Sequence, residues 1–133
     1  MIDLGLLILR LVFGLTFAAH GTQKLFGWFG GYGLAGTGSW MESIGLKPGK
    51  TMAALAGLME LAGGLLLAAG VLTEVAVVLI VATMLVAIAK VHGSKGYWST
   101  NGGYELNLAI IAVAVAVALT GPGAHSLANF LAK

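Results

Sequence analysis

Apolar residues in this chain form four long, nearly continuous runs, separated by polar or glycine-rich segments. The runs cover residues 4–26, 51–69, 74–91 and 104–119. A helix needs about 20 apolar residues to cross a bilayer. Backbone groups in hydrocarbon must be hydrogen-bonded within their own segment, and these runs lack the alternation of barrel strands. The pattern therefore predicts an all-α membrane protein, a bundle of four transmembrane helices.

The segments between the runs differ in length. Only residues 71–73 separate the second run from the third, so these helices are expected to form a tight antiparallel hairpin. Thr73 and Glu74 resemble a helix start, with a hydroxyl cap followed by a carboxylate near the positive end of the dipole. The first connection, residues 27–50, is long and rich in glycine and aromatic residues, and we predict it to be a loop.

Composition agrees with a lipid environment. Hydrophobic residues make up 59% of the chain and charged residues only 9%, with a mean hydropathy of +0.97. So few charges could not cover the surface of a soluble domain of this size. We therefore expect one integral membrane domain over residues 1–133, with residues 126–133 forming a helical turn or two at the interface. The first run has no basic segment before it, so it is interpreted as a spanning helix and not as a signal peptide.

Several function classes are excluded by what the sequence lacks. The net charge of +2 is small and scattered, which argues against nucleic-acid binding. The chain has no cysteine, which removes thiol redox chemistry, iron–sulfur clusters and thiolate metal sites. No metal site and no flavin or nucleotide fingerprint is predicted.

An even number of spans places both termini on one side of the membrane and the two long connections on the other. Lys47, Lys50 and Lys95 lie in the long connections, against Lys133 on the side of the termini. The positive-inside rule then puts the long connections in the cytoplasm and the termini outside.

Every tryptophan and tyrosine falls at the side of the long connections. They are Trp28, Tyr32, Trp40, Tyr97, Trp98 and Tyr104. Aromatic belts that anchor helices at headgroup depth normally occur on both faces. The one-sided distribution therefore favours a binding mouth, with Trp28, Trp98 and Tyr104 as candidate substrate-binding residues. An interfacial anchor is the alternative.

Two charged residues lie deep inside the spans. Arg10 is in the first run and Glu60 is near the middle of the second. If both helices start at equal planes, the two residues differ in depth by about 8 Å at 1.5 Å per residue. Lone charges in hydrocarbon are costly, so we predict an Arg10–Glu60 ion pair facing the bundle axis. A packing clamp between two helices, without further function, is the alternative role.

A second polar layer is expected near the mouth. It consists of His20, Lys24, Lys90, His92 and Glu105. His20 and Lys24 are four residues apart, which places them on one face of a helix. We predict His20, Lys24 and Glu105 as catalytic residues, and Lys90 and His92 as substrate-binding residues. Alternatively, the lysines extend to lipid phosphates and the histidines lie at the interface.

The order and spacing of these residues resemble the DoxX family of small four-helix membrane proteins. The matching features run nearly end to end: Arg10 with Gly14, His20-Gly21 and Lys24, Ile44-Gly45-Leu46, Glu60 to Gly64 with Gly70, Met84 to Ala87 with His92, Gly103-Tyr104-Glu105, and Gly121-Pro122-Gly123 before Ser126-Leu127. The resemblance implies a location in the bacterial inner membrane. It also implies a shared polar core of Arg10, His20, Lys24, Glu60 and Glu105, with His92 beside it.

Two functions are compatible with this resemblance. Relatives include the small subunit of a thiosulfate:quinone oxidoreductase and proteins linked to oxidative stress, which implies a quinone-linked redox subunit. In such a subunit, the hydrogen-bond donors of this chain would bind the quinone carbonyls, and a partner subunit would supply electrons. A haem held by His20 and His92 is a less favoured variant, because lysines crowd the same zone. The alternative is a non-enzymatic module that binds a small amphipathic molecule or scaffolds a partner, alone or as a homo-oligomer.

Overall fold

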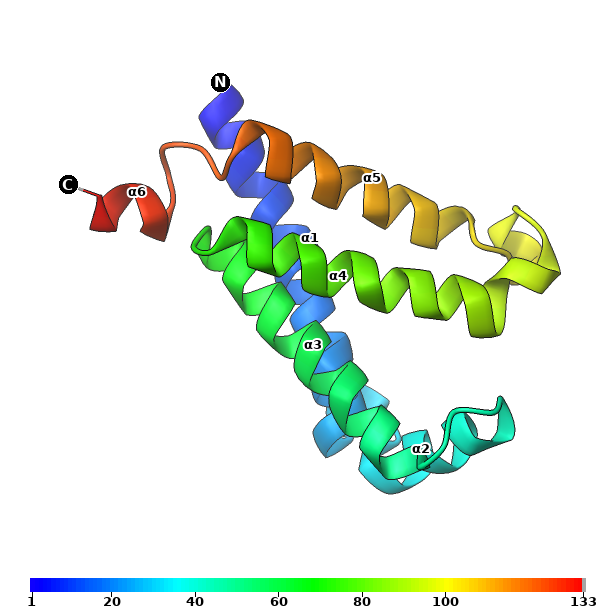
Figure 1. Cartoon of the computed structure of the whole chain (residues 1–133). Coiled ribbons are helices and arrows are strands. Elements are labelled where there is room, and N and C mark those ends of the chain that lie inside the picture. Colours follow the sequence, from blue (N-terminus) through cyan, green and yellow to red (C-terminus); the bar gives the residue numbers. More distant parts are fainter. Residues whose placement is uncertain (133) are drawn as a thin grey trace.

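A computed structural model describes residues 1–132 as an almost entirely helical chain, in which no strand occurs (Figure 1). Lys133, which entered the charge comparison above, lies outside the described residues. The α-helices are α1 (Ile2–Phe26), α2 (Gly33–Ser43), α3 (Gly49–Ala69), α4 (Thr73–Ala87), α5 (Glu105–Thr120) and α6 (Leu127–Leu131). A π-helical turn, η2 (Ile88–His92), continues α4, and short 3₁₀ turns are η1 (Trp28–Gly30), η3 (Gly93–Lys95) and η4 (Ser99–Asn101).

The four apolar runs correspond to α1, α3, α4 with η2, and α5, so the predicted all-helical membrane bundle is confirmed. Three helical segments are long and apolar enough to cross a membrane: Ile2–Phe26, Gly49–Ala69 and Thr73–Lys95. The fourth, α5, has 16 residues, which span about 24 Å and fall short of a hydrocarbon core of about 30 Å. The first connection is not a simple loop, because it contains the 11-residue helix α2.

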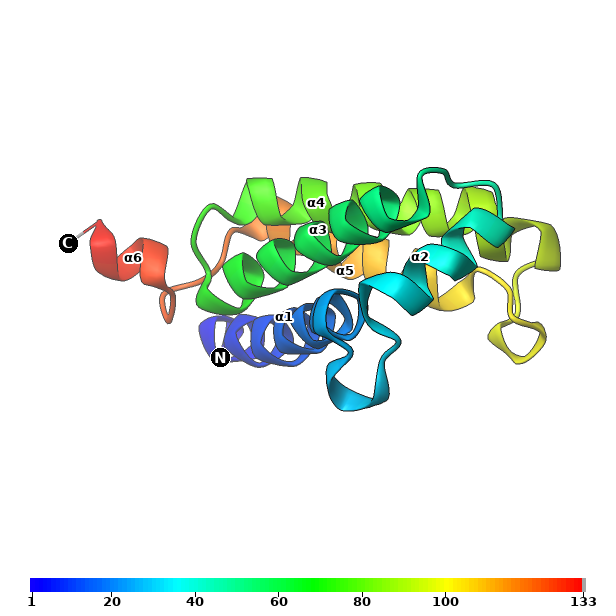
Figure 2. The same ribbon diagram turned by 90° about the horizontal axis from the view of Figure 1, so that it is seen from below.

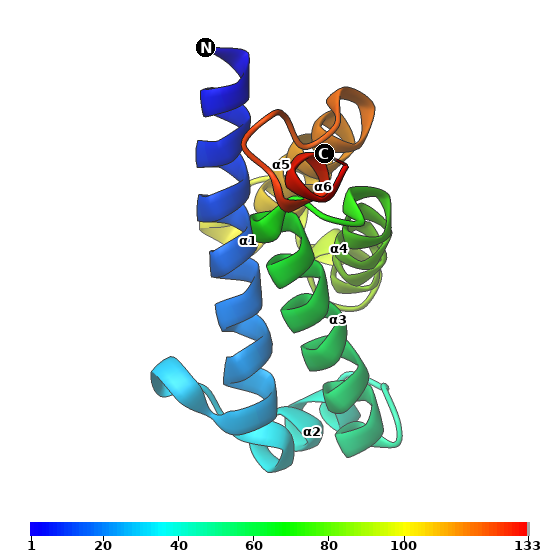
Figure 3. The ribbon, with the colours of Figure 1, turned by 90° about the vertical axis from the view of Figure 1, so that its left-hand side faces the viewer.

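The helices form two antiparallel pairs. α1 lies along α3 over most of its length, with α2 across the far end of both (Figure 3). α4 follows α3 after a tight turn and pairs with α5 (Figure 1). The two pairs meet near the N-terminus and diverge towards the long connections. Figure 2 shows the N-terminus, the α3–α4 turn and α6 together, away from α2.

Glycines allow α1 and α3 to pack backbone against backbone. A Cβ atom on Gly14 would lie 2.6 Å from the amide nitrogen of Ala68, and one on Gly21 would lie 2.6 Å from the carbonyl oxygen of Gly57. Membrane helices associate through such small residues because lipid provides no hydrophobic drive between them. These contacts fix the register between α1 and α3.

The hydrophobic core lies where the two pairs meet. Phe17 of α1, Leu67 of α3, Ile80 of α4 and Val117 of α5 are all buried in one cluster. The cluster therefore joins the pairs near the termini and leaves their other halves separated.

A compact end is built around the α3–α4 turn. Gly70 ends α3 in the left-handed region, with a φ of 72°. Its carbonyl oxygen accepts a hydrogen bond from the amide of Ala128 at 3.1 Å, which ties the start of α6 to the turn. We call the N-terminal part of α1, this turn and residues 121–128 the closed end. We call the C-terminal part of α1, η1, α2, η2 and residues 93–104 the open end.

Candidate functional site

A cleft of about 770 Å³ separates the two helix pairs in the half of the molecule towards the open end. Its walls come from α1, α2 and α3 on one side and from α4, η2 and α5 on the other. Most of the lining is apolar, and it includes four of the five methionines of the chain. These are Met41, Met52, Met59 and Met84. The cleft thus has the size and lining of a small-molecule site.

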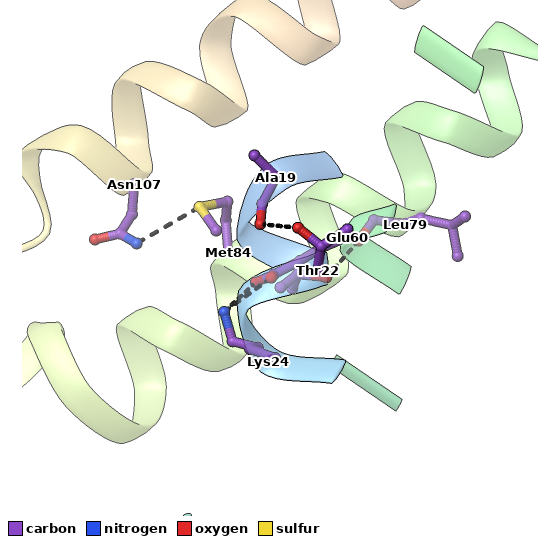
Figure 4. Close-up of polar contacts among 8 residues, drawn as sticks. Ala19, Thr22, Lys24, Glu60, Leu79, Met84 and Asn107 are labelled. Carbon is purple, nitrogen blue, oxygen red and sulfur yellow. Dashed lines mark hydrogen bonds and ion pairs between the residues drawn. The ribbon is translucent and has the colours of Figure 1, made fainter. Parts of the chain in front are cut away.

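An ion pair lies in the wall of the cleft. The Lys24 ammonium is 2.8 Å from Oε2 and 3.0 Å from Oε1 of Glu60 (Figure 4). The Glu60 side chain is 6% exposed and that of Lys24 is 24% exposed. The carboxylate is therefore neutralised within the bundle, and the lysine retains access to the cleft.

This pairing corrects the predicted partner of Glu60, which was Arg10. The register set by Gly14 and Gly21 places Glu60 level with the fifth and sixth turns of α1, near residues 18–21. Arg10 is then about 12–16 Å away along the helix axis, at 1.5 Å per residue. Lys24 can reach Glu60 because helical side chains lean towards the N-terminus of their helix. The assumption of equal starting planes was the source of the error.

Arg10 is instead bound at the closed end. It is 1% exposed, and its guanidinium donates hydrogen bonds to the carbonyl oxygens of Pro122, His125 at 2.8 Å and Ala68 at 3.4 Å. Ala68 lies in the last turn of α3, where the helix dipole favours a cation. Arg10 does not line the cleft; it joins α1 to the segment that precedes α6.

Three further predicted site residues do line the cleft: His20, Lys90 and His92. Lys90 and His92 lie in η2, and π-helical turns of this kind are frequent at functional sites. Nδ1 of His92 is 2.7 Å from the carbonyl oxygen of Gly102. A carbonyl only accepts, so Nδ1 carries the hydrogen and Nε2 remains available. The structure thus brings His20, Lys24, Glu60, Lys90 and His92 to one cavity.

The other predicted site residues lie outside the cleft lining. Glu105 accepts a hydrogen bond from the amide of Ser99 at 3.1 Å, which braces the turn before α5. The Tyr97 ring packs edge-on against Trp98 at 4.9 Å and against Tyr104 at 5.5 Å between ring centroids. Trp28 packs edge-on against Phe29 and, with its ring tilted, against Phe26. These aromatic residues stabilise the connections of the open end.

Several cleft residues were missed at the level of the sequence. Trp40 and Met41 come from the C-terminal part of α2, and Ile44 follows its last residue; the glycine-rich composition had concealed this helix. Met52 and Met59 are seven residues apart, or about two helical turns, on the face of α3 that also bears Glu60. This methionine spacing was the available signal. Asn107 is also in the lining, and its amide lies 3.5 Å from the sulfur of Met84 (Figure 4).

No group of three or more histidine, aspartate or glutamate side chains in residues 1–132 is arranged to hold a metal ion. His20 and His92, the residues considered for haem, both border the cleft. Haem ligation by this pair stays a prediction.

Comparison with known proteins identifies the family. The DoxX family model matches residues 5–93, which include α1, α2, α3, α4 and η2. Searches of the curated proteins and of the solved structures found no match. The matched range contains the Lys24–Glu60 pair, Arg10 and both cleft histidines. The chain is a multi-pass membrane protein that belongs to the DoxX family.

Proposed function

We propose that this protein binds a quinone-like amphiphile in its cleft and serves a quinone-linked redox system of the bacterial inner membrane, as a subunit or accessory protein. The observation that carries the proposal is a largely apolar cleft whose lining also includes charged and polar side chains from both of its sides. Amphipathic molecules need this combination, because an apolar tail and a polar head must both be accommodated.

The donors suit the carbonyl oxygens of a quinone ring. Lys24 and Lys90 carry ammonium protons, and His20 adds an imidazole. Glu60 accepts from Lys24 and holds its ammonium group in the wall of the cleft. Trp40 and the methionine thioethers offer faces on which a flat ring packs favourably.

Reduction of a bound quinone needs electrons from another protein, because the chain lacks cysteine and has no flavin or nucleotide fingerprint. The chain's own groups would hold the ring and exchange protons with its oxygens. A partner subunit that supplies the electrons is therefore part of this proposal. The exposed aromatic residues of the open end, including Trp28 and Trp98, offer a surface for such contact.

The second candidate function is a non-enzymatic module that binds an amphipathic molecule or scaffolds a partner. It needs the same cleft but no electron transfer. Reduction of bound quinone by a co-purifying partner distinguishes the redox role from simple binding. Genes next to this one that encode a dehydrogenase, a dioxygenase or a sulfur enzyme would name the pathway.

Ligand binding can be measured with the tryptophan that lines the cleft. Trp40 borders the cleft whereas Trp28 and Trp98 do not. A protein with Trp28→Phe and Trp98→Phe should show saturable quenching of Trp40 fluorescence when a short-chain ubiquinone is added in nanodiscs. The matched control carries Trp40→Phe and Trp98→Phe, and its Trp28 should show only weak, linear quenching. Equal, non-saturable quenching of both proteins would contradict binding in the cleft.

The proposed orientation places the open end in the cytoplasm, on the side of Lys47, Lys50 and Lys95. A reporter enzyme that works only in the periplasm should be active when fused to the C-terminus. Activity only from a cytoplasmic reporter at that position would reverse the orientation.

A further inference from the structure

The charges along the cleft do not balance. Its lining contains two lysines, Lys24 and Lys90, and a single carboxylate, Glu60. Both oxygens of Glu60 are within 3.0 Å of the Lys24 ammonium. Lys90 makes no ion pair with any residue between 1 and 132. The cleft therefore has a surplus positive charge at η2.

No other acidic side chain is available to neutralise Lys90. Glu42 accepts from the amide of Gly49 at 3.0 Å, and Glu105 accepts from the amide of Ser99 at 3.1 Å. Neither of these carboxylates lines the cleft. The remaining two acidic residues lie in the first turns of α1 and α4, at the closed end. Lys90, which is exposed, therefore has no carboxylate partner among residues 1–132 and is free to pair with an anionic ligand.

His92 adds an acceptor two residues from Lys90. Its Nδ1 hydrogen is directed to the carbonyl of Gly102, which leaves Nε2 as the acceptor of the neutral ring. A ligand with an acidic hydroxyl could pass its proton to this nitrogen and leave its own oxygen negatively charged. Lys90 would then bind that oxygen by a charge-assisted hydrogen bond.

The rest of the lining fits an aromatic ring. Thioether and aromatic side chains come from both sides of the cleft: Phe13, Phe17, Trp40, Met41, Met52, Met59 and Met84. Methionine sulfur makes favourable contacts with aromatic rings, and its flexible side chain adapts to rings of different shape. The leucines and valines among the lining residues extend this surface for an alkyl chain.

We propose that the preferred ligand is an acidic aromatic amphiphile, a ring bearing an ionisable hydroxyl, whose anion pairs with Lys90. The inference rests on the proposed function, because it assigns a ligand class to the same cleft. It goes further by making the charge of the head group, and not the quinone ring alone, the basis of selection. Lipid phosphate offers a similar anion, so the test must separate the two sources.

The test compares two probes that differ only in the acidic proton. One is a 2-hydroxy-3-alkyl-1,4-naphthoquinone, which is an anion at neutral pH, and the other is its 2-methoxy derivative, which is neutral. Binding is measured by Trp40 fluorescence in nanodiscs of uncharged lipid at pH 7.5. We expect the acidic probe to bind roughly tenfold more tightly, the factor that corresponds to one favourable charge interaction.

The variant Lys90→Gln should lower the affinity for the acidic probe about tenfold and that for the neutral probe by much less, so that the preference disappears. Lys95→Gln is the matched control, since Lys95 follows in η3 and does not line the cleft. It should bind both probes as the wild type does. Thermal unfolding of both variants shows whether a change in affinity reflects a change in fold.

Other outcomes would overturn the inference. Equal affinity for both probes, unaffected by Lys90→Gln, would leave quinone binding intact and remove the role of charge. Absence of binding by either probe would reject the proposed function itself. Loss of the preference in nanodiscs containing phosphatidylglycerol would show that Lys90 binds lipid phosphate and does not select the ring.

Discussion

The two ends of the bundle each hold a basic side chain from α1 in an apolar environment, but they neutralise it differently. At the closed end, Arg10 is 1% exposed and is surrounded by backbone carbonyls. At the open end, Lys24 is 24% exposed and is paired with a carboxylate. Arg10 does not line the cleft of about 770 Å³, whereas Lys24 does.

This difference indicates a structural role for Arg10 and a functional role for the lysines that line the cleft. Carbonyls belong to the backbone and can bind Arg10 only where residues 122–125 and the end of α3 are already in place. The ion pair at the open end depends on two side chains, and Lys90, which lines the same cleft, makes no ion pair with any of residues 1–132. A buried cation held by carbonyls therefore indicates assembly, and a surplus cation beside a cavity indicates ligand binding.

Removal of Arg10 is expected to have the largest effect. Arg10→Met would leave the carbonyls of Pro122, His125 and Ala68 without their donor. Hydrogen bonds to a charged group contribute about 1.5–3 kcal/mol each, so we expect a loss of about 3 kcal/mol or more. Thermal unfolding in detergent measures the loss. Arg10→Lys keeps the charge but has fewer hydrogen-bond donors. Its stability should therefore lie between those of Arg10→Met and the wild type. Unfolding of Arg10→Met at the wild-type temperature would show that the closed end does not depend on this cation.

Disruption of the Lys24–Glu60 pair at the open end should lower the stability by less than removal of Arg10 does. Glu60→Ala leaves the Lys24 ammonium unpaired, and because Lys24 is partly exposed we expect a loss of about 2–3 kcal/mol, below the range for a fully buried pair. The double variant Lys24→Met/Glu60→Ala should be less destabilised than the two single changes added together. Arg10→Met and Glu60→Ala should instead be additive, because the two residues are far apart. Coupling between Arg10 and Glu60, with none to Lys24, would restore the pairing first predicted.

The four apolar runs were enough to predict the helices, because length and hydropathy decide which segments can cross a bilayer. They did not show which residues pair with the charged side chains inside the helices. The register between α1 and α3 arises from close backbone contacts at Gly14 and Gly21, and such contacts form only in three dimensions. Helix α2 was missed because glycine lowers helix propensity, while packing of Gly38 against the start of α3 stabilises it.

The predicted site residues divide in the same way between those that helix patterns could place and those that they could not. Five polar residues predicted for the mouth or the intramembrane pair do share the cleft, since they lie at similar depth on helices that face one another. Glu105 and the aromatic residues Trp28, Trp98 and Tyr104 do not, because local hydrogen bonds and ring contacts hold them within the connections. Depth can be estimated by counting residues along a helix, but the direction of a side chain in a loop cannot.

A change at the α1–α3 contact tests the register that brings Lys24 to Glu60. A methyl group at Gly21 would lie 2.6 Å from the carbonyl oxygen of Gly57, so Gly21→Ala must push the helices apart. Overpacking of this kind costs about 1–2 kcal/mol and should also weaken binding of the quinone probe. Gly5→Ala is the matched control on the same helix, since nothing lies within 4 Å of its new methyl group. Equal stability of the two variants would contradict the close contact.

The smallest effect is expected at Glu105, where the structure and the sequence suggest different roles. Glu105→Gln keeps an oxygen that can accept from the Ser99 amide but removes its charge, so we expect a loss of about 0.5–1 kcal/mol. Binding of the quinone probe should change less than twofold, because this side chain does not border the cleft. His20→Ala, a change within the cleft lining, should weaken binding several-fold with little change in unfolding temperature. If Glu105→Gln instead abolished quinone turnover in the assembled system at wild-type stability, Glu105 would be a proton-transfer residue that reaches the ligand after a movement of residues 93–104. The open end would then be the mobile part of the site, in contrast to the closed end that Arg10 holds in place.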